Sequence, residues 1–574
     1  MKKLMLGNEA VARGAYEAGA RVVSSYPGTP STEVTEFAAQ YKEINCEWAP
    51  NEKVAAEVAF GAAMTGARSM TCMKHVGVNV AADPLFTAAY TGVSGGMVVL
   101  CADDPAMHSS QNEQDSRFYA RAAHIPMLEP SDSQECKDFT KLAFELSEKY
   151  DTPVFVRLTT RIAHARSAVM LNERGVAEVK PYQRDFMKYV MMPGMARRRH
   201  VVVEQRMKAL AEDANALPVN RVEMGETSLG VICSGASYTY VKEALPNASV
   251  LKLGLVHPLP QRLIEDFAQQ VQHLIVIEEL EPVLEQQVAA LGIKVEGKNL
   301  TGLQGELSVS KVRAIFGQEV PAEPADTLPA TPPVLCPGCP HRGAFYAMKK
   351  LKLKVFGDIG CYTMAALPPI NMLDACLCMG ASIGMAFGAE KAQGKEFSRH
   401  AVAVLGDSTF IHSGITPLID AVYNGGTITV VILDNRITGM TGHQQNPATG
   451  KNIYDEPAPQ LNLEALCLAC GVQHIRVADP FDQKGLFQVL KEETAREAVS
   501  VVIVRRPCEL LLKGAKTPAI VDSCRDCGAC LQLGCPAIER GEKGMRINTA
   551  LCVDCGLCVS VCPHKAIRVG RGAQ

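Results

Sequence analysis

Several patterns that are common in proteins are scarce in this sequence of 574 residues. It contains a single tryptophan and 6% aromatic residues, so a surface for stacking bases or sugars is not expected. Lysine and arginine number 58 against 61 aspartates and glutamates, which leaves a formal charge of −3 and no basic excess for nucleic acid or anionic lipid. No uninterrupted apolar stretch reaches the roughly 18 residues that a membrane-spanning helix needs. The sequence therefore predicts neither a membrane nor a nucleic-acid partner.

The N-terminal segment also lacks the apolar centre of a signal peptide, because Asn8, Glu9 and Arg13 interrupt it. A soluble, cytoplasmic protein is therefore expected. Cysteine is abundant by contrast, with 21 residues, several of them in Cys-x-x-Cys spacing. In a reducing compartment this spacing indicates metal or redox chemistry rather than disulfides.

Composition divides the chain into segments. Short β-rich runs alternate with helical stretches rich in Ala and Gly, which is typical of βαβ units in parallel sheets. Three segments share this pattern: residues 1–165, 226–316 and 334–512. A polar stretch at 166–225 and a proline-rich stretch at 317–333 are expected to be linkers. The sequence thus predicts an α/β protein with three doubly wound parallel-sheet domains and a small cysteine-rich domain at 513–574.

The C-terminal segment contains two Cys-x-x-Cys-x-x-Cys runs, CRDCGACLQLGCP and CVDCGLCVSVCP. Three thiolates spaced two residues apart can bind one face of an iron–sulfur cubane, and the distant fourth cysteine of each run is expected to ligate the other cluster. One predicted [4Fe–4S] site consists of Cys524, Cys527, Cys530 and Cys562. The other consists of Cys552, Cys555, Cys558 and Cys535. Zinc is the alternative, because paired Cys-x-x-Cys motifs also bind zinc.

This segment resembles the bacterial two-[4Fe–4S] ferredoxin domain over about 50 residues. It departs from that pattern at one place, where four residues separate Cys530 from Cys535 instead of three. The departure concerns the local geometry and not the ligation. The resemblance implies that the domain carries single electrons.

Two expected strands end in polar residues that suit a magnesium ion. AVAVLGDSTF ends at Gly406 and Asp407, and TITVVILDNRITG ends at Asp434 and Asn435. One crossover helix fits between them, so Asp407 and Asn435 are expected at the same edge of a sheet. Their oxygens suit Mg²⁺ that also binds phosphate oxygens. The alternative is that both are ordinary polar residues at strand ends.

This Gly-Asp pair followed by Asn resembles the motif of thiamine-diphosphate enzymes. The resemblance implies that Asp407, Asn435 and the backbone carbonyl of Ile437 hold Mg²⁺ on the diphosphate. Gly406 and Ser408, on either side of Asp407, are then expected to contact the cofactor.

Thiamine enzymes also need a carboxylate beside the aminopyrimidine ring of the cofactor. The segment NEKVAAEVAFGA supplies Glu52 at the start of an expected apolar helix, and Glu57 on a different face of it. From the residues alone, either is an ordinary helix glutamate. The family resemblance favours Glu52.

The motifs SYPGTPSTE, NEKVAAEVAFGA, GDSTFIHSG and DNRITGMTGHQ together resemble those of 2-oxoacid:ferredoxin oxidoreductases. The implied order is a pyrimidine-binding domain, a transketolase C-terminal-like domain, a diphosphate domain and a ferredoxin domain, over nearly the full length. By this resemblance Thr29 lies near the thiazolium ring and the substrate. His75, in MKHVGVNVAADP, is expected to line the same pocket, with a structural histidine as the alternative.

A third cluster is implied by the same resemblance. Pyruvate-type relatives hold a cluster beside the thiamine with a CxGC motif, an IGC motif and a cysteine after the last strand. This chain has CPGCPHR, GDIGCYT and VVIVRRPCE, which supply Cys336, Cys339, Cys361 and Cys508. Core or loop thiols are the alternative. The nine remaining cysteines are interpreted as buried apolar residues.

The resemblance implies oxidative decarboxylation of an arylpyruvate, such as indolepyruvate, to its acyl-CoA, with the electrons passed to an external ferredoxin. The chain would be the large subunit, with a separate small subunit, in a hetero-oligomer built on a dimer of the large subunit. One alternative is that the enzyme oxidises another 2-oxoacid. A non-oxidative thiamine decarboxylase or ligase with a regulatory iron–sulfur tail is a second, and a non-catalytic electron-transfer subunit is a third.

Overall fold

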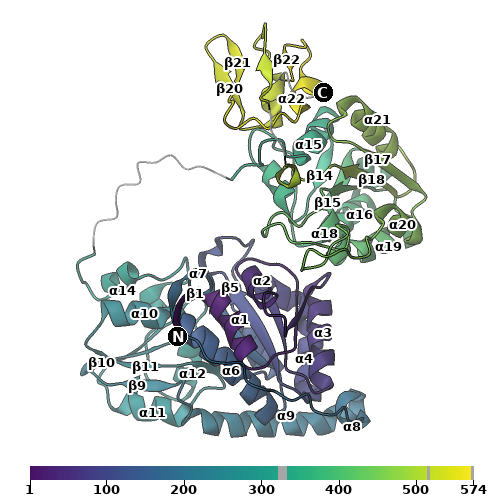
Figure 1. Cartoon of the computed structure of the whole chain (residues 1–574). Coiled ribbons are helices and arrows are strands. Elements are labelled where there is room, and N and C mark those ends of the chain that lie inside the picture. The colour runs from purple at the N-terminus through teal and green to yellow at the C-terminus, as the bar shows by residue number, and fades with distance from the viewer. Residues whose placement is uncertain (321–332, 514–516, 570–574) are drawn as a thin grey trace. The chain divides into compact units, whose positions relative to one another are not determined.

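The structure is a computed structural model that describes residues 1–320, 333–513 and 517–569. The chain divides into two compact units, Met1–Asp326 and Thr327–Gln574 (Figure 1). Most of the predicted linker at 317–333 lies outside the described residues. Both units combine helices with mainly parallel sheets, which confirms the predicted α/β class. Within the described ranges, no helix is long and apolar enough to cross a membrane.

The main sheet of the first unit is mostly parallel. Among the described residues its strand order is β12-β6-β7-β5-β4-β2-β3. The strands are β2 (Val22–Ser25), β3 (Asn45–Trp48), β4 (Ser69–Lys74), β5 (Met97–Asp103), β6 (Met127–Leu128), β7 (Val154–Thr159) and β12 (Leu255–His257). Neighbouring strands are parallel except for β12 and β6. Strands β5 and β7 are buried along their whole length, as expected where helices cover both faces.

A second sheet lies in the same unit, with the order β13-β10-β11-β9 in the described part of the chain. Its strands are β9 (Arg221–Glu223), β10 (Glu226–Cys233), β11 (Ala248–Lys252) and β13 (Leu274–Ile277). Strand β9 pairs with β11, although it precedes the expected start of this domain at residue 226. Because β12 from the same segment joins the main sheet, the segments at 1–165 and 226–316 share a sheet edge.

The helices of the first unit follow its strands in βαβ fashion. They are α1 (Gly7–Glu17), α2 (Thr32–Ala38), α3 (Glu52–Met64), α4 (His75–Thr91), α5 (Arg117–Ala123), α6 (Ser133–Tyr150), α7 (Thr160–His164), α8 (Phe186–Tyr189), α9 (Pro193–Ala214), α10 (Gly235–Ala244), α11 (Gln261–Gln269), α12 (Val283–Ala290), α13 (Lys298–Thr301) and α14 (Val309–Ile315). Helix α3 begins soon after β3, and α4 begins directly after β4. The first residues of both helices therefore lie at the carboxyl edge of the sheet, where α/β proteins bind ligands.

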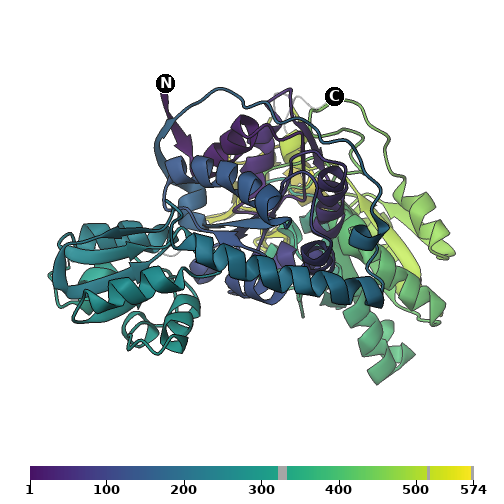
Figure 2. The ribbon, with the colours of Figure 1, turned by 90° about the horizontal axis from the view of Figure 1, so that it is seen from below.

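The segment at 166–225 contains regular structure. Strand β8 (Arg166–Met170) pairs antiparallel with β1 (Lys2–Leu6). The long helix α9 crosses the first unit (Figure 2). Its Arg199 donates from Nε to the carbonyl oxygen of Tyr90 at 2.7 Å, and Arg206 donates to the carbonyl of Ala89. These bonds join α9 to the last turn of α4.

The second unit is built on a parallel sheet with the order β14-β15-β16-β18-β17 within its described residues. The strands are β14 (Lys354–Phe356), β15 (Ala401–Gly406), β16 (Thr429–Asp434), β17 (His474–Ala478) and β18 (Ser500–Arg505). The helices are α15 (His341–Lys350), α16 (Ala381–Gln393), α17 (Lys395–Ser398), α18 (Asp407–Thr409), α19 (Ile415–Tyr423), α20 (Leu463–Ala469) and α21 (Gln483–Thr494). Strands β15 and β16 are fully buried and end at the Gly-Asp and Asp-Asn pairs.

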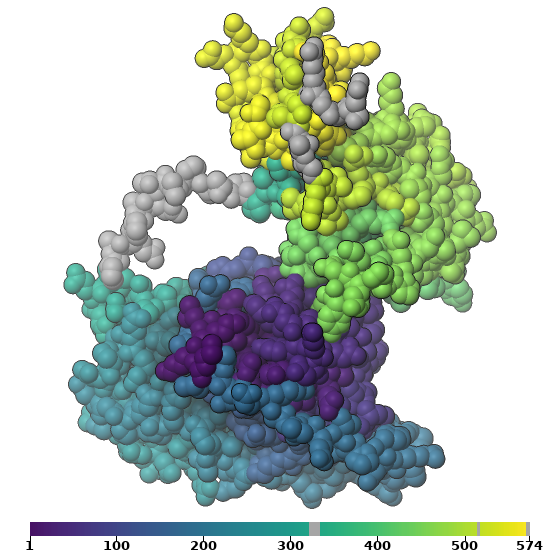
Figure 3. Space-filling model, viewed as in Figure 1, coloured from purple at the N-terminus to yellow at the C-terminus, as the bar shows by residue number. Residues whose placement is uncertain are grey.

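The C-terminal segment of the same unit forms its own lobe, yellow in Figure 3. It pairs β19 (Ile520–Val521) with β22 (Ile567–Arg568) and β20 (Ile538–Gly541) with β21 (Gly544–Ile547), both antiparallel, and adds the short helix α22 (Leu557–Val561). Leu533, Leu557 and Ile567 form its small core, together with Tyr346 from α15. The lobe therefore packs on α15.

The nine cysteines left without a predicted ligand role are not all buried. Six are: Cys46, Cys72, Cys101, Cys136, Cys233 and Cys467. Cys470 is half-buried, and Cys376 and Cys378 are exposed, so the interpretation as buried residues is wrong for the last two. Ala375 forms an isolated parallel β-bridge with Phe356, the last residue of β14. Cys376 and Cys378 follow in the irregular segment between this bridge and α16, and their side chains are exposed there.

Candidate functional site

The ends of β15 and β16 bring three predicted ligand oxygens together. Gly406 and Leu433 are register partners on adjacent parallel strands, so Asp407 and Asn435 leave the sheet at the same edge. The side-chain oxygen of Asn435 faces Oδ1 of Asp407 at 3.2 Å and the carbonyl oxygen of Ile437 at 2.8 Å. Three oxygens at these distances repel one another unless a donor or a cation lies among them.

Two arrangements relieve this repulsion. Turning the amide of Asn435 would let its nitrogen donate to Asp407 and to Ile437. A cation would leave the amide as it is, because octahedral Mg²⁺ with oxygens at 2.0–2.1 Å sets neighbouring ligands about 2.9 Å apart. Asp407 favours the cation, since its Oδ2 is buried and has no hydrogen-bond partner in the described residues. Burial, with the nearby Asp434 charge, raises the pKa of Asp407 to about 7. The residues therefore fit a bound divalent cation.

Polar side chains that the sequence did not single out surround this edge. Ser408 accepts a hydrogen bond from Thr438 Oγ1 at 3.1 Å, and Asn446 donates to Thr438 at 3.2 Å. Asp358 is fully buried and accepts from the amides of Gly380 and Ser382 at 2.9 and 3.1 Å. The sequence did contain a pattern that pointed to Asp358. This residue follows Gly357 after the end of β14, just as Asp407 follows Gly406 at the end of β15. Thr438 and Asn446 lie in an irregular loop without a recognisable pattern.

Two of the predicted third-cluster cysteines border this edge. The backbone amide of Cys508 donates to the carbonyl oxygen of Asn435 at 2.9 Å. A Cβ placed on Gly439 would lie 3.5 Å from Sγ of Cys361 and 3.8 Å from Nδ2 of Asn435. Tyr362, next to Cys361, donates to the carbonyl of Ile359 at 2.8 Å. One small region thus contains an Mg²⁺-type oxygen group and two thiols.

All four thiols of this predicted set lie close enough to affect one another. Cys339 is buried, Cys361 and Cys508 are half-buried, and Cys336 is exposed. Burial raises the pKa of Cys339 to about 12, with a contribution from Cys361 and Cys508. Burial also raises the pKa of Cys361 to about 11, with a contribution from Cys508 and Cys336. Thiols of this kind become thiolates when a metal supplies the opposing charge.

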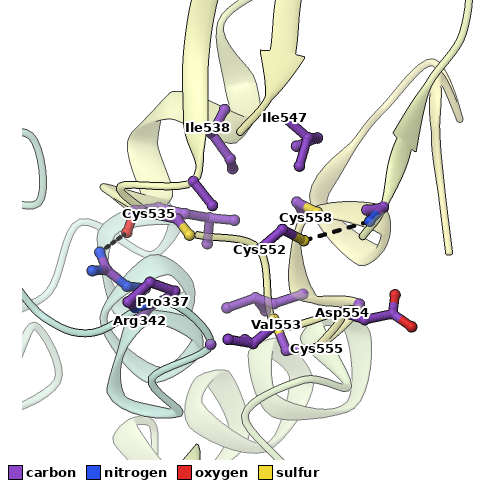
Figure 4. Close-up of a pocket in the computed structure, with 16 residues that line it drawn as sticks. Pro337, Arg342, Cys535, Ile538, Ile547, Cys552, Val553, Asp554, Cys555 and Cys558 are labelled. Atoms are coloured by element: carbon purple, nitrogen blue, oxygen red, sulfur yellow. Dashed lines mark hydrogen bonds between the residues drawn. The ribbon is translucent and has the colours of Figure 1, made fainter. Parts of the chain in front are cut away.

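The C-terminal lobe has two cysteine-lined cavities. The first, of about 430 Å³ with its solvent, is lined by Cys535, Cys552, Cys555 and Cys558 (Figure 4). The second, of about 330 Å³ with its solvent, is lined by Cys524, Cys527, Cys530 and Cys562. Each cavity takes three cysteines from one run and the last cysteine of the other, which is the grouping that the spacing predicts.

The thiols surround these cavities without converging on a point. In the described parts of the chain, no three His, Cys, Asp or Glu side chains are placed to share one metal ion. A zinc ion would need its sulfur ligands about 2.3 Å from one centre. Four thiols that surround a common space, rather than a single point, suit a multi-atom cluster instead.

Local sequence shapes both runs in the same way. Asp526 and Gly528 have positive φ of 48° and 69°, and Asp554 and Gly556 repeat this with 56° and 76°. Asp tolerates the left-handed region and Gly enters it without strain, so each Asp-Cys-Gly turn wraps its cysteines around a cavity. Backbone amides donate to three of the thiol sulfurs at 3.3–3.4 Å: Cys524, Cys552 and Cys562. Such bonds stabilise thiolates and set cluster potentials.

The predicted third cluster site and the first cavity are neighbours in the second unit. Pro337 and Gly338, between Cys336 and Cys339, line the first cavity. A Cβ on Gly338 would lie 2.5 Å from Cγ2 of Val553. Glycine is therefore needed for the CPGC loop to approach the second cysteine run this closely.

In the first unit, Thr29, Glu52 and His75 follow β2, β3 and β4, which are adjacent in the sheet. Glu52 is 4% exposed and opens α3. A Cβ on Gly77 of α4 would lie 2.8 Å from Cγ and Oε1 of Glu52, so α4 approaches this carboxylate because residue 77 has no side chain. Glu57 is exposed and pairs with Lys53.

His75 and Thr29 differ in their surroundings. His75 is 1% exposed, and neither ring nitrogen has a hydrogen-bond partner among the described residues. Burial lowers its pKa, which favours the neutral ring. Thr29 is half-buried, and its carbonyl accepts from Ser109 Oγ at 3.5 Å. These residues share one strand edge with Glu52 in a single unit.

Comparisons with known families agree with this layout. Residues 13–223 match the family described as pyruvate flavodoxin/ferredoxin oxidoreductase, thiamine diphosphate-binding. Residues 358–504 match the C-terminal TPP-binding domain of thiamine pyrophosphate enzymes, and residues 545–568 match a 4Fe-4S binding domain. The protein is a ferredoxin-dependent 2-oxoacid oxidoreductase that uses thiamine diphosphate and iron–sulfur clusters.

Two curated relatives narrow this class to one family. Indolepyruvate oxidoreductase subunit IorA of Archaeoglobus fulgidus is 40% identical over 99% of this chain and 97% of its own length. The IorA subunit of Pyrococcus horikoshii is 39% identical over 100% of this chain and 98% of its own. A solved 2-oxoglutarate:ferredoxin oxidoreductase from Magnetococcus marinus is 19% identical, with a TM-score of 0.48 over 55% of this chain and 64% of that one. The chain belongs to the indolepyruvate oxidoreductase IorA family.

Proposed function

We propose that this chain is the large, catalytic subunit of an enzyme that converts indolepyruvate and related arylpyruvates, with CoA, to the arylacetyl-CoA and CO₂. Two electrons pass singly to an external ferredoxin. The names of its relatives support the substrate. The observation that carries the oxidative assignment is the bond from the Cys508 amide to the carbonyl of Asn435 at 2.9 Å. It joins a magnesium-type site directly to a cysteine loop, as a thiamine enzyme that exports electrons requires.

Each cofactor-binding role falls to named residues. Asp407, Asn435 and the Ile437 carbonyl would hold Mg²⁺, with Gly406 and Ser408 beside the diphosphate. Thiamine diphosphate, when bound, supplies the electron sink for decarboxylation.

The residues of the first unit would act on the reacting end of the cofactor. Glu52 would exchange a proton with the aminopyrimidine ring, and its burial keeps water from competing for that proton. Thr29 and neutral His75 would line the substrate pocket, where His75 can hold or move a proton at a ring nitrogen.

Three [4Fe–4S] clusters are proposed for the three cysteine sets. Iron–sulfur clusters, when bound, carry single electrons. Contacts between protein loops support an order in which electrons would pass the three sites. The CPGC loop lies against the first cavity through Gly338 and Val553. The first cavity shares its two cysteine runs with the second, because Cys535 and Cys562 each cross to the opposite site. Electrons would thus leave by the second cavity.

The partners follow from this assignment. We propose a separate small subunit, as the subunit names of the relatives suggest. An external ferredoxin would accept the electrons, and CoA would accept the acyl group. The assembly would be a hetero-oligomer built on a dimer of the large subunit.

The third cluster has a direct test in the iron content. The wild-type chain is expected to hold about twelve iron atoms, four for each of three [4Fe–4S] clusters. Cys361→Ser is expected to lower the content to about eight, measured by a colorimetric iron assay on anaerobically purified protein. The matched control is Cys470→Ser, which changes a half-buried thiol outside the predicted sets. Equal iron in wild type and Cys361→Ser would remove Cys361 from the ligands.

The function is tested by anaerobic reduction of a viologen dye, with this chain and its small subunit expressed together. Indolepyruvate, phenylpyruvate, pyruvate and 2-oxoglutarate are compared, with and without CoA. CoA-dependent reduction by the two aryl substrates alone is expected. Reduction with pyruvate or 2-oxoglutarate instead would keep the chemistry and overturn the substrate. Release of CO₂ without dye reduction would favour a non-oxidative thiamine enzyme.

A further inference from the structure

Arg342 is a buried arginine between two of the cysteine sites. It is the second residue of α15 and is 2% exposed. Its Nε donates to the carbonyl of Cys336 at 3.1 Å, its Nη1 donates to the carbonyl of Leu533 at 2.9 Å, and its Nη2 donates to the carbonyl of Leu335. One side chain thus connects the CPGC loop to the segment that precedes Cys535. Arg342 also lines the first cavity (Figure 4).

The positive charge of Arg342 has no carboxylate partner among the described residues. All three hydrogen bonds go to neutral carbonyl oxygens. Leaving a charge unpaired in a protein interior is strongly unfavourable. Burial lowers the pKa of Arg342, and the ionisable groups that oppose this shift are the thiols of Cys535, Cys339, Cys336 and Cys555. Arginine keeps its proton at neutral pH, so a buried cation faces thiols from two predicted cluster sites.

The four-residue spacing between Cys530 and Cys535 contributes to the contact between Arg342 and this segment. Between Cys530 and Cys535 the chain forms a short 3₁₀ turn and then reaches Gly534, with φ of 65°. A Cβ on Gly534 would lie 3.2 Å from Nη1 of Arg342. The four-residue spacing thus presents the Leu533 carbonyl to the guanidinium.

We propose that Arg342 is the shared counter-ion of these two sites, and that its charge favours the reduced state of the cluster held by Cys535, Cys552, Cys555 and Cys558. This rests on the proposed function, since it takes clusters to be bound there. Reduction adds one electron, drawn from oxidation of the 2-oxoacid, and makes the cluster more negative. A fixed cation at the cavity wall stabilises that added charge without a proton.

The test is an EPR-monitored redox titration of the full-length chain. Arg342→Gln is expected to make one cluster at least tenfold harder to reduce, a midpoint lower by about 59 mV. The midpoint of the cluster at Cys524, Cys527, Cys530 and Cys562 should not move, because Arg342 does not line that cavity. Arg342→Lys keeps the charge and should stay within threefold of wild type.

Lys349→Gln is the matched control. Lys349 lies on the same helix and donates to the carbonyls of Pro369 and Ile370 at 2.7 and 3.0 Å, but it does not line the cavity. Its removal is expected to leave every midpoint in place.

The outcomes separate the two proposals. A wild-type chain without iron–sulfur signals would overturn the proposed function. Wild-type signals with an unchanged midpoint in Arg342→Gln would overturn the counter-ion role alone. Loss of iron from both Arg342 variants would also overturn it, because Arg342 would then be needed for assembly and not for the potential.

Discussion

Asp407→Ala is expected to lower thiamine-dependent dye reduction by about a thousandfold or more, equivalent to about 4 kcal/mol of transition-state stabilisation. The side chain provides one of three oxygens that meet at the ends of β15 and β16, and its second oxygen has no partner in the described residues. Without it, the remaining Asn435 and Ile437 oxygens cannot hold Mg²⁺ on a diphosphate. Calorimetric titration with thiamine diphosphate and Mg²⁺ should show the same loss as affinity.

Stability distinguishes this loss from misfolding. Asp407 is a buried carboxylate whose pKa is raised, so its removal is expected to leave the cofactor-free protein at least as stable as wild type in thermal unfolding. The control is Asp420→Ala, an exposed carboxylate on α19 in the same unit, which should keep full activity. If Asp407→Ala keeps more than a tenth of the activity, the cation is held elsewhere.

Glu52→Gln is expected to reduce kcat by about 10²- to 10⁴-fold, the usual contribution of a general acid or base. Glutamine has nearly the same shape, so the contact with Gly77 is retained and thiamine diphosphate should still bind. Steady-state dye reduction and calorimetric binding together measure the two effects.

Glu57→Gln provides the matched control on the same helix. Glu57 is exposed, and its pair with Lys53 lies on the helix surface, where such pairs add little to stability. Its replacement should leave kcat within twofold of wild type. The opposite result, with a large loss in Glu57→Gln and none in Glu52→Gln, would transfer the role to Glu57.

Features that depend on short segments were predictable from the sequence. Alternating apolar runs predicted the parallel sheets, because a strand buried on both faces must be apolar throughout. The two cysteine runs predicted which thiols share a cavity, because ligand spacing along a few residues limits which atoms can meet. The strand-end position of Asp407 and Asn435 predicted that they meet, because parallel strands end at one edge.

Features that depend on distant segments were not predictable. The interpretation of Cys376 and Cys378 as buried residues failed because residue type alone does not show where a connection runs. Nothing local indicated that β12 would join the main sheet, or that the Cys508 amide would bond to the Asn435 carbonyl. Asp358 had a local signal in its Gly-Asp pair, whereas Thr438 and Asn446 had none.

The sequence by itself thus determined the fold class, and it predicted which thiols share a cavity and which oxygens meet at one sheet edge, because each follows from periodicity or spacing within a short stretch. Tertiary structure alone placed Gly77 against Glu52 and the CPGC loop against Val553. It also joined Arg342 to Leu533, which is 191 residues away along the chain. Such contacts are decided when whole elements pack, since their partners satisfy buried charge and backbone groups that no local pattern encodes.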